Sequence, residues 1–149
     1  MQQLQTLFYL LLGVPLVVFL VAYLQAEQPG YTARLNASFG LHLAFWLVGV
    51  LLSYWAWQHY NRQVKTGNPS ARLTDKFAHY RRTSLVSYVV LSGTMLLVAG
   101  GLWLTGTVFL GALFSLILIA MAALRPTAEQ FIEHMHLSTE EQAQLLHQE

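Results

Sequence analysis

Long apolar runs separated by polar segments dominate the pattern of this chain. Four runs contain no Asp, Glu, Lys or Arg, namely residues 7–25, 39–60, 84–104 and 107–124. Each approaches the roughly 20 residues that an α-helix needs to cross a 30 Å hydrocarbon core at 1.5 Å per residue. The runs are continuous and do not alternate with a period of two. They therefore predict membrane helices and not barrel strands.

The composition agrees with this pattern. Of the 149 residues, 55% are hydrophobic and only 10% are charged, whereas a soluble domain has about 25% charged residues. We therefore expect an all-α integral membrane protein. Residues 1–125 would form an up-and-down bundle of four transmembrane helices, and residues 126–149 a short helical cytoplasmic tail. The first run is preceded by no Lys or Arg and is long for a signal peptide, so we expect a retained span.

The distribution of Lys and Arg predicts the orientation of the helices. Six of the eight Lys and Arg residues lie between the second and third runs, whereas the segment between the first and second holds only Arg34. Short loops rich in Lys and Arg stay on the cytoplasmic side. We therefore expect this central loop and both termini to face the cytoplasm. The expected location is a prokaryotic plasma (inner) membrane.

The central loop carries a candidate patch for lipid headgroups or a partner, formed by Arg72, Lys76, Arg81 and Arg82. Thr74 and Asp75 are suited to begin a helix over residues 73–82, which would rest Phe77 and Tyr80 on the membrane surface. Basic residues near a membrane surface attract anionic headgroups. The patch is either a lipid-sensing or partner-binding site or an ordinary positive-inside anchor, and we favour the anchor.

The segment after the fourth run differs in kind from the rest. Pro126 ends the fourth helix, because proline cannot continue the backbone hydrogen bonding. Two capping-box patterns follow, beginning at Thr127 and Ser138. They predict two short helices, near residues 128–136 and 139–148. This tail is acidic, so we expect residues 127–149 to dock onto the basic central loop or onto a cytoplasmic partner.

One face of the second run carries polar, aromatic and small residues at steps of three and four. This candidate polar stripe consists of His42, Trp46, Gly49, Ser53, Trp57 and Tyr60. It either lines a path or cavity for a small molecule, or packs against neighbouring helices, where small and hydroxylated residues allow close approach. We favour packing. The third run carries a similar face, with Ser84, Ser87, Tyr88, Ser92, Ala99 and Trp103.

Chemistry-bearing groups are scarce within the four runs. They contain no Asp, Glu, Lys or Arg, the usual markers of proton or ion coupling. The chain has no cysteine, which excludes disulfides and thiolate metal sites. His42 and His59 lie at opposite ends of the second run and have no histidine partner on another run. We therefore expect no metal, no cofactor and no nucleic-acid partner.

These features predict a non-catalytic membrane protein that acts by assembly, as a homo-oligomer or as a small subunit of a larger membrane complex. Its expected partners are the lipid bilayer and either itself or other membrane subunits. A channel or carrier for a small solute is the alternative, with the polar stripe as its lining. A haem-bearing electron-transfer subunit is a weaker alternative, because two haems would have to be shared across a homodimer.

Overall fold

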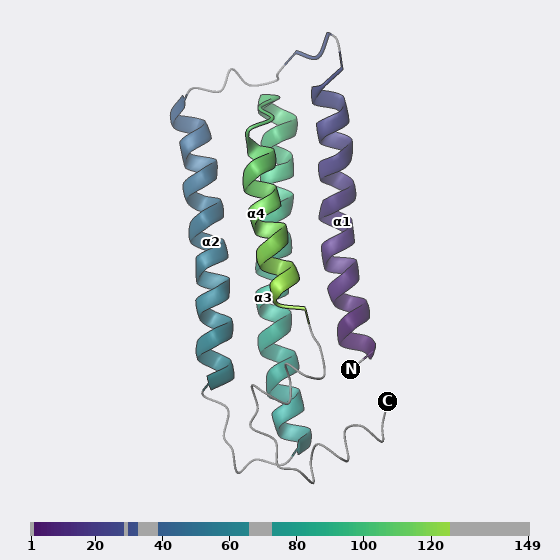
Figure 1. Cartoon of the computed structure of the whole chain (residues 1–149), viewed down its shortest axis with the longest axis vertical. Coiled ribbons are helices and arrows are strands. Elements are labelled where there is room, and N and C mark those ends of the chain that lie inside the picture. Colours follow the sequence, from purple (N-terminus) through teal and green to yellow (C-terminus); the bar gives the residue numbers. More distant parts are fainter. Residues whose placement is uncertain (1, 29, 33–38, 66–72, 126–149) are drawn as a thin grey trace.

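The computed structural model describes residues 2–28, 30–32, 39–65 and 73–125, and the regular structure in these segments is entirely helical. The helices are α1 (Gln2–Ala26), α2 (Phe39–Lys65), α3 (Leu73–Thr105) and α4 (Leu110–Ala123). They lie side by side, with α3 and α4 between α1 and α2 (Figure 1). The expectation of an all-α chain with four helices is confirmed. The tail, residues 126–149, lies outside the described residues.

Helix α3 is the centre of the packing. It contacts α1, α2 and α4, and α4 also contacts α2. In the most apolar stretch of each long helix, 56% of α3 is buried, against 17% of α1 and 11% of α2. The core therefore consists of α3 and the faces that the other helices turn toward it. Much of the surface of α1 and α2 remains an apolar exterior.

Contacts at both ends of the helices establish their relative directions. α1 runs parallel to α3, because Phe8 packs on Tyr88 near one end and Gln25 accepts a hydrogen bond from Trp103 near the other. α2 runs antiparallel to α3, as two contacts at opposite ends show: Tyr60 with Tyr80, and Phe45 with Gly101. The chain thus reverses direction between successive helices.

A glycine closes the tight connection between α3 and α4. Gly106 has φ of 66°, in the left-handed region, and its N–H donates to the carbonyl oxygen of Leu102 at 2.8 Å. This is the single-bond helix ending that glycine favours because it lacks a Cβ. Only Gly106 and three further residues separate the two helices, so α4 must fold back directly along α3.

Three of the helices are long and apolar enough to cross a membrane. The fourth is shorter than the predicted run of residues 107–124. It begins at Leu110 and has 14 residues, about 21 Å at 1.5 Å per residue. Hydrogen-bonded turns at Thr107 and Val108 precede it, and a turn at Leu124 follows it.

The start of α3 corrects the prediction for the central loop. Residues 73–82 do not form a separate surface helix but continue into α3, which has 33 residues. No proline or glycine interrupts the helix before Gly93, and Asp75 in the first turn complements the helix dipole. Tyr80 was expected on the membrane surface, and this was wrong. Its side chain is fully buried against Tyr60.

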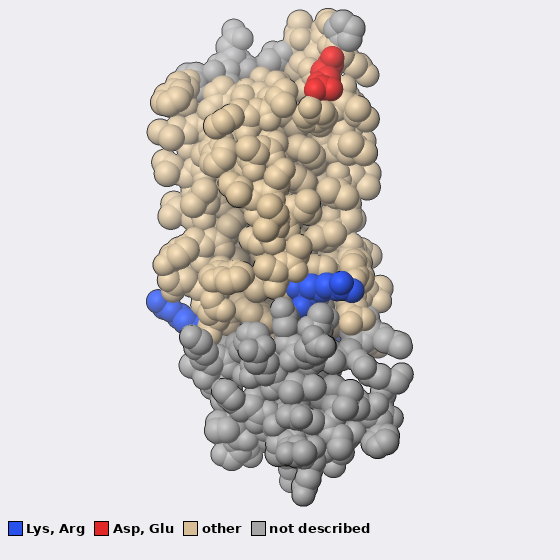
Figure 2. Space-filling view, in the orientation of Figure 1, with Lys and Arg blue, Asp and Glu red and all other residues tan. Residues whose placement is uncertain are grey.

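The described basic side chains gather at one end of the molecule, here called the basic end. They belong to Arg62, Arg81, Arg82 and Arg125, and Arg125 lies over the ring of Tyr9 near the start of α1. Glu27 lies at the opposite end, here called the Glu27 end. In the face shown by Figure 2, a band without charged residues separates the two.

We expect Gly106→Ala to lower the stability of the protein by about 1 kcal/mol, because an L-residue with a Cβ is strained at positive φ. Thermal unfolding of the purified protein in detergent would measure the change. Gly100→Ala is the matched control, because a Cβ at helical Gly100 would meet no atom within 4 Å. Equal unfolding midpoints for the two variants would contradict this account of the turn.

Candidate functional site

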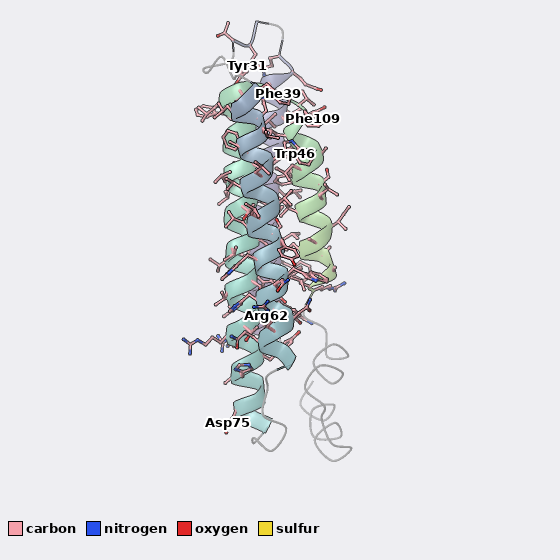
Figure 3. All side chains as sticks on the ribbon, turned by 90° about the vertical axis from the view of Figure 1, so that its left-hand side faces the viewer. Tyr31, Phe39, Trp46, Arg62, Asp75 and Phe109 are labelled. Carbon is pink, nitrogen blue, oxygen red and sulfur yellow. The ribbon has the colours of Figure 1, made fainter. Side chains whose placement is uncertain are left out.

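The polar stripe of α2 packs against α4 in its half nearer the Glu27 end. His42 Nε2 lies 2.5 Å from Thr107 Oγ1, and the Trp46 ring lies on Phe109 with centroids 5.2 Å apart (Figure 3). Gly49 is buried, and a Cβ there would lie 2.9 Å from Leu113 Cδ2. These three stripe residues therefore join α2 to the first turns of α4.

The other half of the stripe has three different environments. Ser53 donates to the carbonyl oxygen of Gly49 on its own helix at 2.7 Å. Trp57 is 41% exposed, and Tyr60 is buried against α3, with its hydroxyl 3.4 Å from that of Tyr80. The structure thus divides the stripe among contacts with α4, contacts with α3 and open surface.

A cluster of buried hydroxyl groups lies where α2, α3 and α4 meet near the basic end. We call it the hydroxyl cluster, and it consists of Tyr60, Tyr80, Ser84, Ser87 and Tyr88. The Tyr88 hydroxyl donates to the Leu124 carbonyl oxygen at 2.7 Å, and Ser87 Oγ donates to the Ala56 carbonyl oxygen at 3.3 Å. The Ser84 hydroxyl is buried beside the phenol groups of Tyr80 and Tyr88 but makes no well-formed hydrogen bond.

These contacts define what the hydroxyl cluster can do. Hydroxyl groups both donate and accept hydrogen bonds, and an unpaired one inside a protein costs free energy. The hydrogen bonds given above link hydroxyls to one another and to backbone carbonyls, so the cluster joins α3 to α2 and to the end of α4. Tyr88 in particular satisfies a carbonyl at the end of α4, where the helix itself leaves carbonyls unpaired.

The sequence pattern indicates part of this cluster but not how its members come together. Tyr60, Ser84, Ser87 and Tyr88 were placed on two polar faces, whereas Tyr80 was assigned to the membrane surface. The available signal was the spacing of Tyr80, Ser84, Ser87 and Tyr88 at steps of four, three and one, which continues one helical face. Because the third membrane helix was predicted to begin at residue 84, Tyr80 was not assigned to this face.

A groove runs between α2 and α4 on the outside of the molecule, beside the half of the polar stripe nearer the basic end. We call it the α2–α4 groove, and its volume is about 290 Å³. Its lining is mainly apolar and comes from both helices: Val50, Ser53, Tyr54, Trp57, Leu113, Leu116, Ile117 and Ala120. Toward the basic end it adjoins a polar depression lined by Tyr54, Trp57, Gln58, Asn61 and Arg62.

A larger, shallow hollow adjoins the polar depression along α2 and shares Tyr54, Gln58 and Arg62 with it. This outer hollow has a volume of about 750 Å³ and is lined by Leu51, Leu52, Tyr54, Trp55, Gln58, His59, Arg62 and Gln63. Within it the rings of Trp55 and His59 stack, with centroids 5.1 Å apart and an angle of 12° between their planes. Trp55 is 50% exposed. The hollow thus combines open aromatic surface with polar side chains.

The histidines and basic residues singled out in the sequence occupy separate places. His42 and His59 make the different contacts given above, and no group of three metal-ligating side chains occurs among the described residues. Of the candidate headgroup or partner patch, Arg81 and Arg82 are exposed on α3. Arg72 and the Lys76 side chain lie outside the described residues. His79 donates from Nε2 to the Gln63 carbonyl oxygen at 3.0 Å and so links α3 to the end of α2.

Comparisons with known proteins return no match: neither a family model, nor a curated protein, nor a solved structure resembles the chain. Its function must therefore be inferred from its own residues and geometry.

We expect Tyr88→Phe to destabilise the protein by roughly 1–3 kcal/mol, because the buried Leu124 carbonyl oxygen loses its donor. The end of α4 should loosen, so chymotrypsin should cleave after Leu124 faster than in the parent protein. Thermal unfolding and timed proteolysis would measure both effects. Tyr9→Phe is the control, since Tyr9 is 49% exposed, and similar cleavage rates for the two variants would refute the role given to Tyr88.

Proposed function

We propose that this chain is an integral membrane protein whose basic end faces the cytoplasm. Three helices have the length and apolarity needed to cross a bilayer. Their outward surface is rich in exposed aliphatic side chains, such as Leu10, Val17 and Leu20 on α1. The charged side chains described lie toward the ends of the helices, and the arginines gather at one of them, as the positive-inside rule requires of a cytoplasmic face. The proposed location remains a prokaryotic plasma membrane, with both termini cytoplasmic.

The absence of cysteine from the chain permits a direct test of this orientation with single-cysteine variants. We expect Gln28→Cys to react with a membrane-impermeant maleimide in intact cells. Ala78→Cys should react only after the membrane is opened. Both positions are exposed and uncharged, so the substitutions leave the charge distribution intact. Labelling of Ala78→Cys in intact cells would overturn the orientation.

Within the membrane we propose a non-catalytic role in assembly, through the side of α2 that carries the outer hollow. The observation that carries this proposal is the hollow itself, where Trp55 and His59 stack beside Gln58 and Gln63. Polar side chains on a membrane helix favour contact with another helix over contact with lipid tails, because they gain hydrogen-bond partners there. The occupant would be a second copy of the chain or a helix of another membrane subunit.

A comparison of α1 and α2 supports this choice of face. Both helices are mostly exposed. Apart from Tyr9, the exposed large residues of α1 are valines and leucines, whereas those of α2 toward the basic end include Tyr54, Trp55 and Trp57. Aliphatic side chains match lipid tails, and aromatic side chains are enriched where proteins associate. α1 therefore fits a lipid-facing role, and α2 fits an interface.

The environment of the polar stripe favours assembly over transport. His42 and Trp46 contact the turn before α4, Gly49 contacts Leu113 of α4, and Tyr60 contacts Tyr80 of α3. The stripe residues nearest the Glu27 end thus contribute to contacts within the chain. A path for a solute along the stripe would have to separate α2 from α4 at Gly49, where Leu113 fills the space.

Cross-linking in native membranes would test the assembly face. We expect Leu51→Cys, in the outer hollow, to form a covalent product with a second copy or with another membrane protein when a short bis-maleimide is added. Val17→Cys on α1 should remain uncross-linked. The two positions are closely matched, with 63% and 61% of their side chains exposed. The mass of the product identifies the partner, and equal cross-linking of both variants would contradict the proposal.

A further inference from the structure

The α2–α4 groove and the polar depression form one continuous feature. Tyr54 and Trp57 line both. On one side of this pair the lining is apolar, with Val50 on α2 and residues such as Leu116 and Ile117 on α4. On the other side are Gln58, Asn61 and Arg62, near the basic end. The feature therefore passes from the almost wholly apolar α2–α4 groove to a mouth that carries two amide side chains and one arginine.

We propose that this combined feature binds one anionic phospholipid, with an acyl chain in the α2–α4 groove and the phosphate at Arg62 and Asn61. The inference rests on the membrane placement proposed above and assigns a specific lipid site to it. The site lies beside the assembly face and shares Tyr54, Gln58 and Arg62 with the outer hollow. Trp57 and the side chains of α4 belong to the lipid site alone.

Charge complementarity identifies the headgroup end. Arg62 is the one charged side chain among the described residues that line the groove and the polar depression. A guanidinium can give two parallel hydrogen bonds to a phosphate, which is stronger and more directional than a single contact. Asn61 and Gln58 add amide donors beside it. A phosphate with a net negative charge fits this mouth.

The length of the feature agrees with one lipid leaflet. Val50 and Arg62 are twelve residues apart on α2, which corresponds to about 18 Å along a helix. Half of a typical hydrocarbon core is about 15 Å thick. A lipid with its phosphate at Arg62 therefore extends its acyl chain past Trp57 toward Val50 without leaving its own leaflet. Trp57 and Tyr54 lie at the depth where amphipathic aromatic rings gather.

The small side chains of Ser53 and Ala120 leave space for the acyl chain of the lipid. Both line the groove, and the Ser53 hydroxyl is satisfied by the Gly49 carbonyl oxygen of its own helix. It therefore does not present an unpaired polar group to the acyl chain. A leucine at position 120 would fill part of the groove without adding charge.

Native mass spectrometry of the full chain in detergent would test the proposal, with dioleoyl phosphatidylglycerol and dioleoyl phosphatidylcholine as probes. We expect one phosphatidylglycerol adduct to be retained, with phosphatidylcholine at the same concentration retained several-fold less. Arg62→Gln should weaken phosphatidylglycerol retention about tenfold, the effect of losing charge-assisted hydrogen bonds. Arg82→Gln should leave it unchanged, because Arg82 is exposed but does not line either part of the feature.

The part of the site that would hold the acyl chain needs a separate test. Ala120→Leu should also reduce retention while its thermal midpoint stays close to that of the parent protein, and dihexanoyl phosphatidylglycerol should bind much more weakly than the dioleoyl lipid. Equal retention of the two headgroups, equal effects of Arg62→Gln and Arg82→Gln, or full binding of the short-chain lipid would each overturn the site. Loss of the protein from membranes on carbonate extraction would instead refute the membrane placement.

Discussion

The pairing of polar groups along α3 is the constraint on which the remaining structure depends. This helix is surrounded on three sides, so its hydroxyl-bearing face has to find partners inside the protein. Tyr80 meets Tyr60 of α2, Ser87 donates to the backbone of α2, and Tyr88 donates to the end of α4. In an apolar environment such bonds also exclude alternative packings, because a displaced helix would leave hydroxyls and carbonyls unsatisfied.

The two ends of the molecule are held together by different means. At the Glu27 end, hydrogen bonds connect α1, the segment after it and α3, through Tyr31, Trp103 and Gln25. The tight turn at Gly106 then places Thr107 beside His42. At the basic end, the hydroxyl cluster performs the corresponding role. Between them the contacts are mainly apolar, as in the stacking of Phe19 on Phe114, with centroids 3.9 Å apart.

The sequence predicts the helices but not which residues of neighbouring helices pack against one another. Apolar runs without charges predict helices directly, and the gap at residues 105–106 between the third and fourth runs marks the turn that Gly106 closes. The register between helices was not predictable, because it depends on local fits such as Leu113 against Gly49 and Phe45 against Gly101. Tyr80 illustrates the limit. Its sequence neighbours Arg81 and Arg82 are exposed, and only the position of α2 in space shows that the tyrosine is buried. The groove was equally hidden, since it exists only where α2 and α4 lie together.

The length of α3 has a mechanical consequence. Its 33 residues correspond to about 50 Å, roughly 20 Å more than a hydrocarbon core. α3 extends past the end of α4 at the basic end (Figure 1). Since no proline or glycine lies between Leu73 and Tyr88, this part of α3 is stiff and continuous with the core, and His79 and Tyr80 connect it to the end of α2. A force applied near Asp75 would therefore reach α2 through these contacts and the end of α4 through the hydrogen bond from Tyr88 to Leu124.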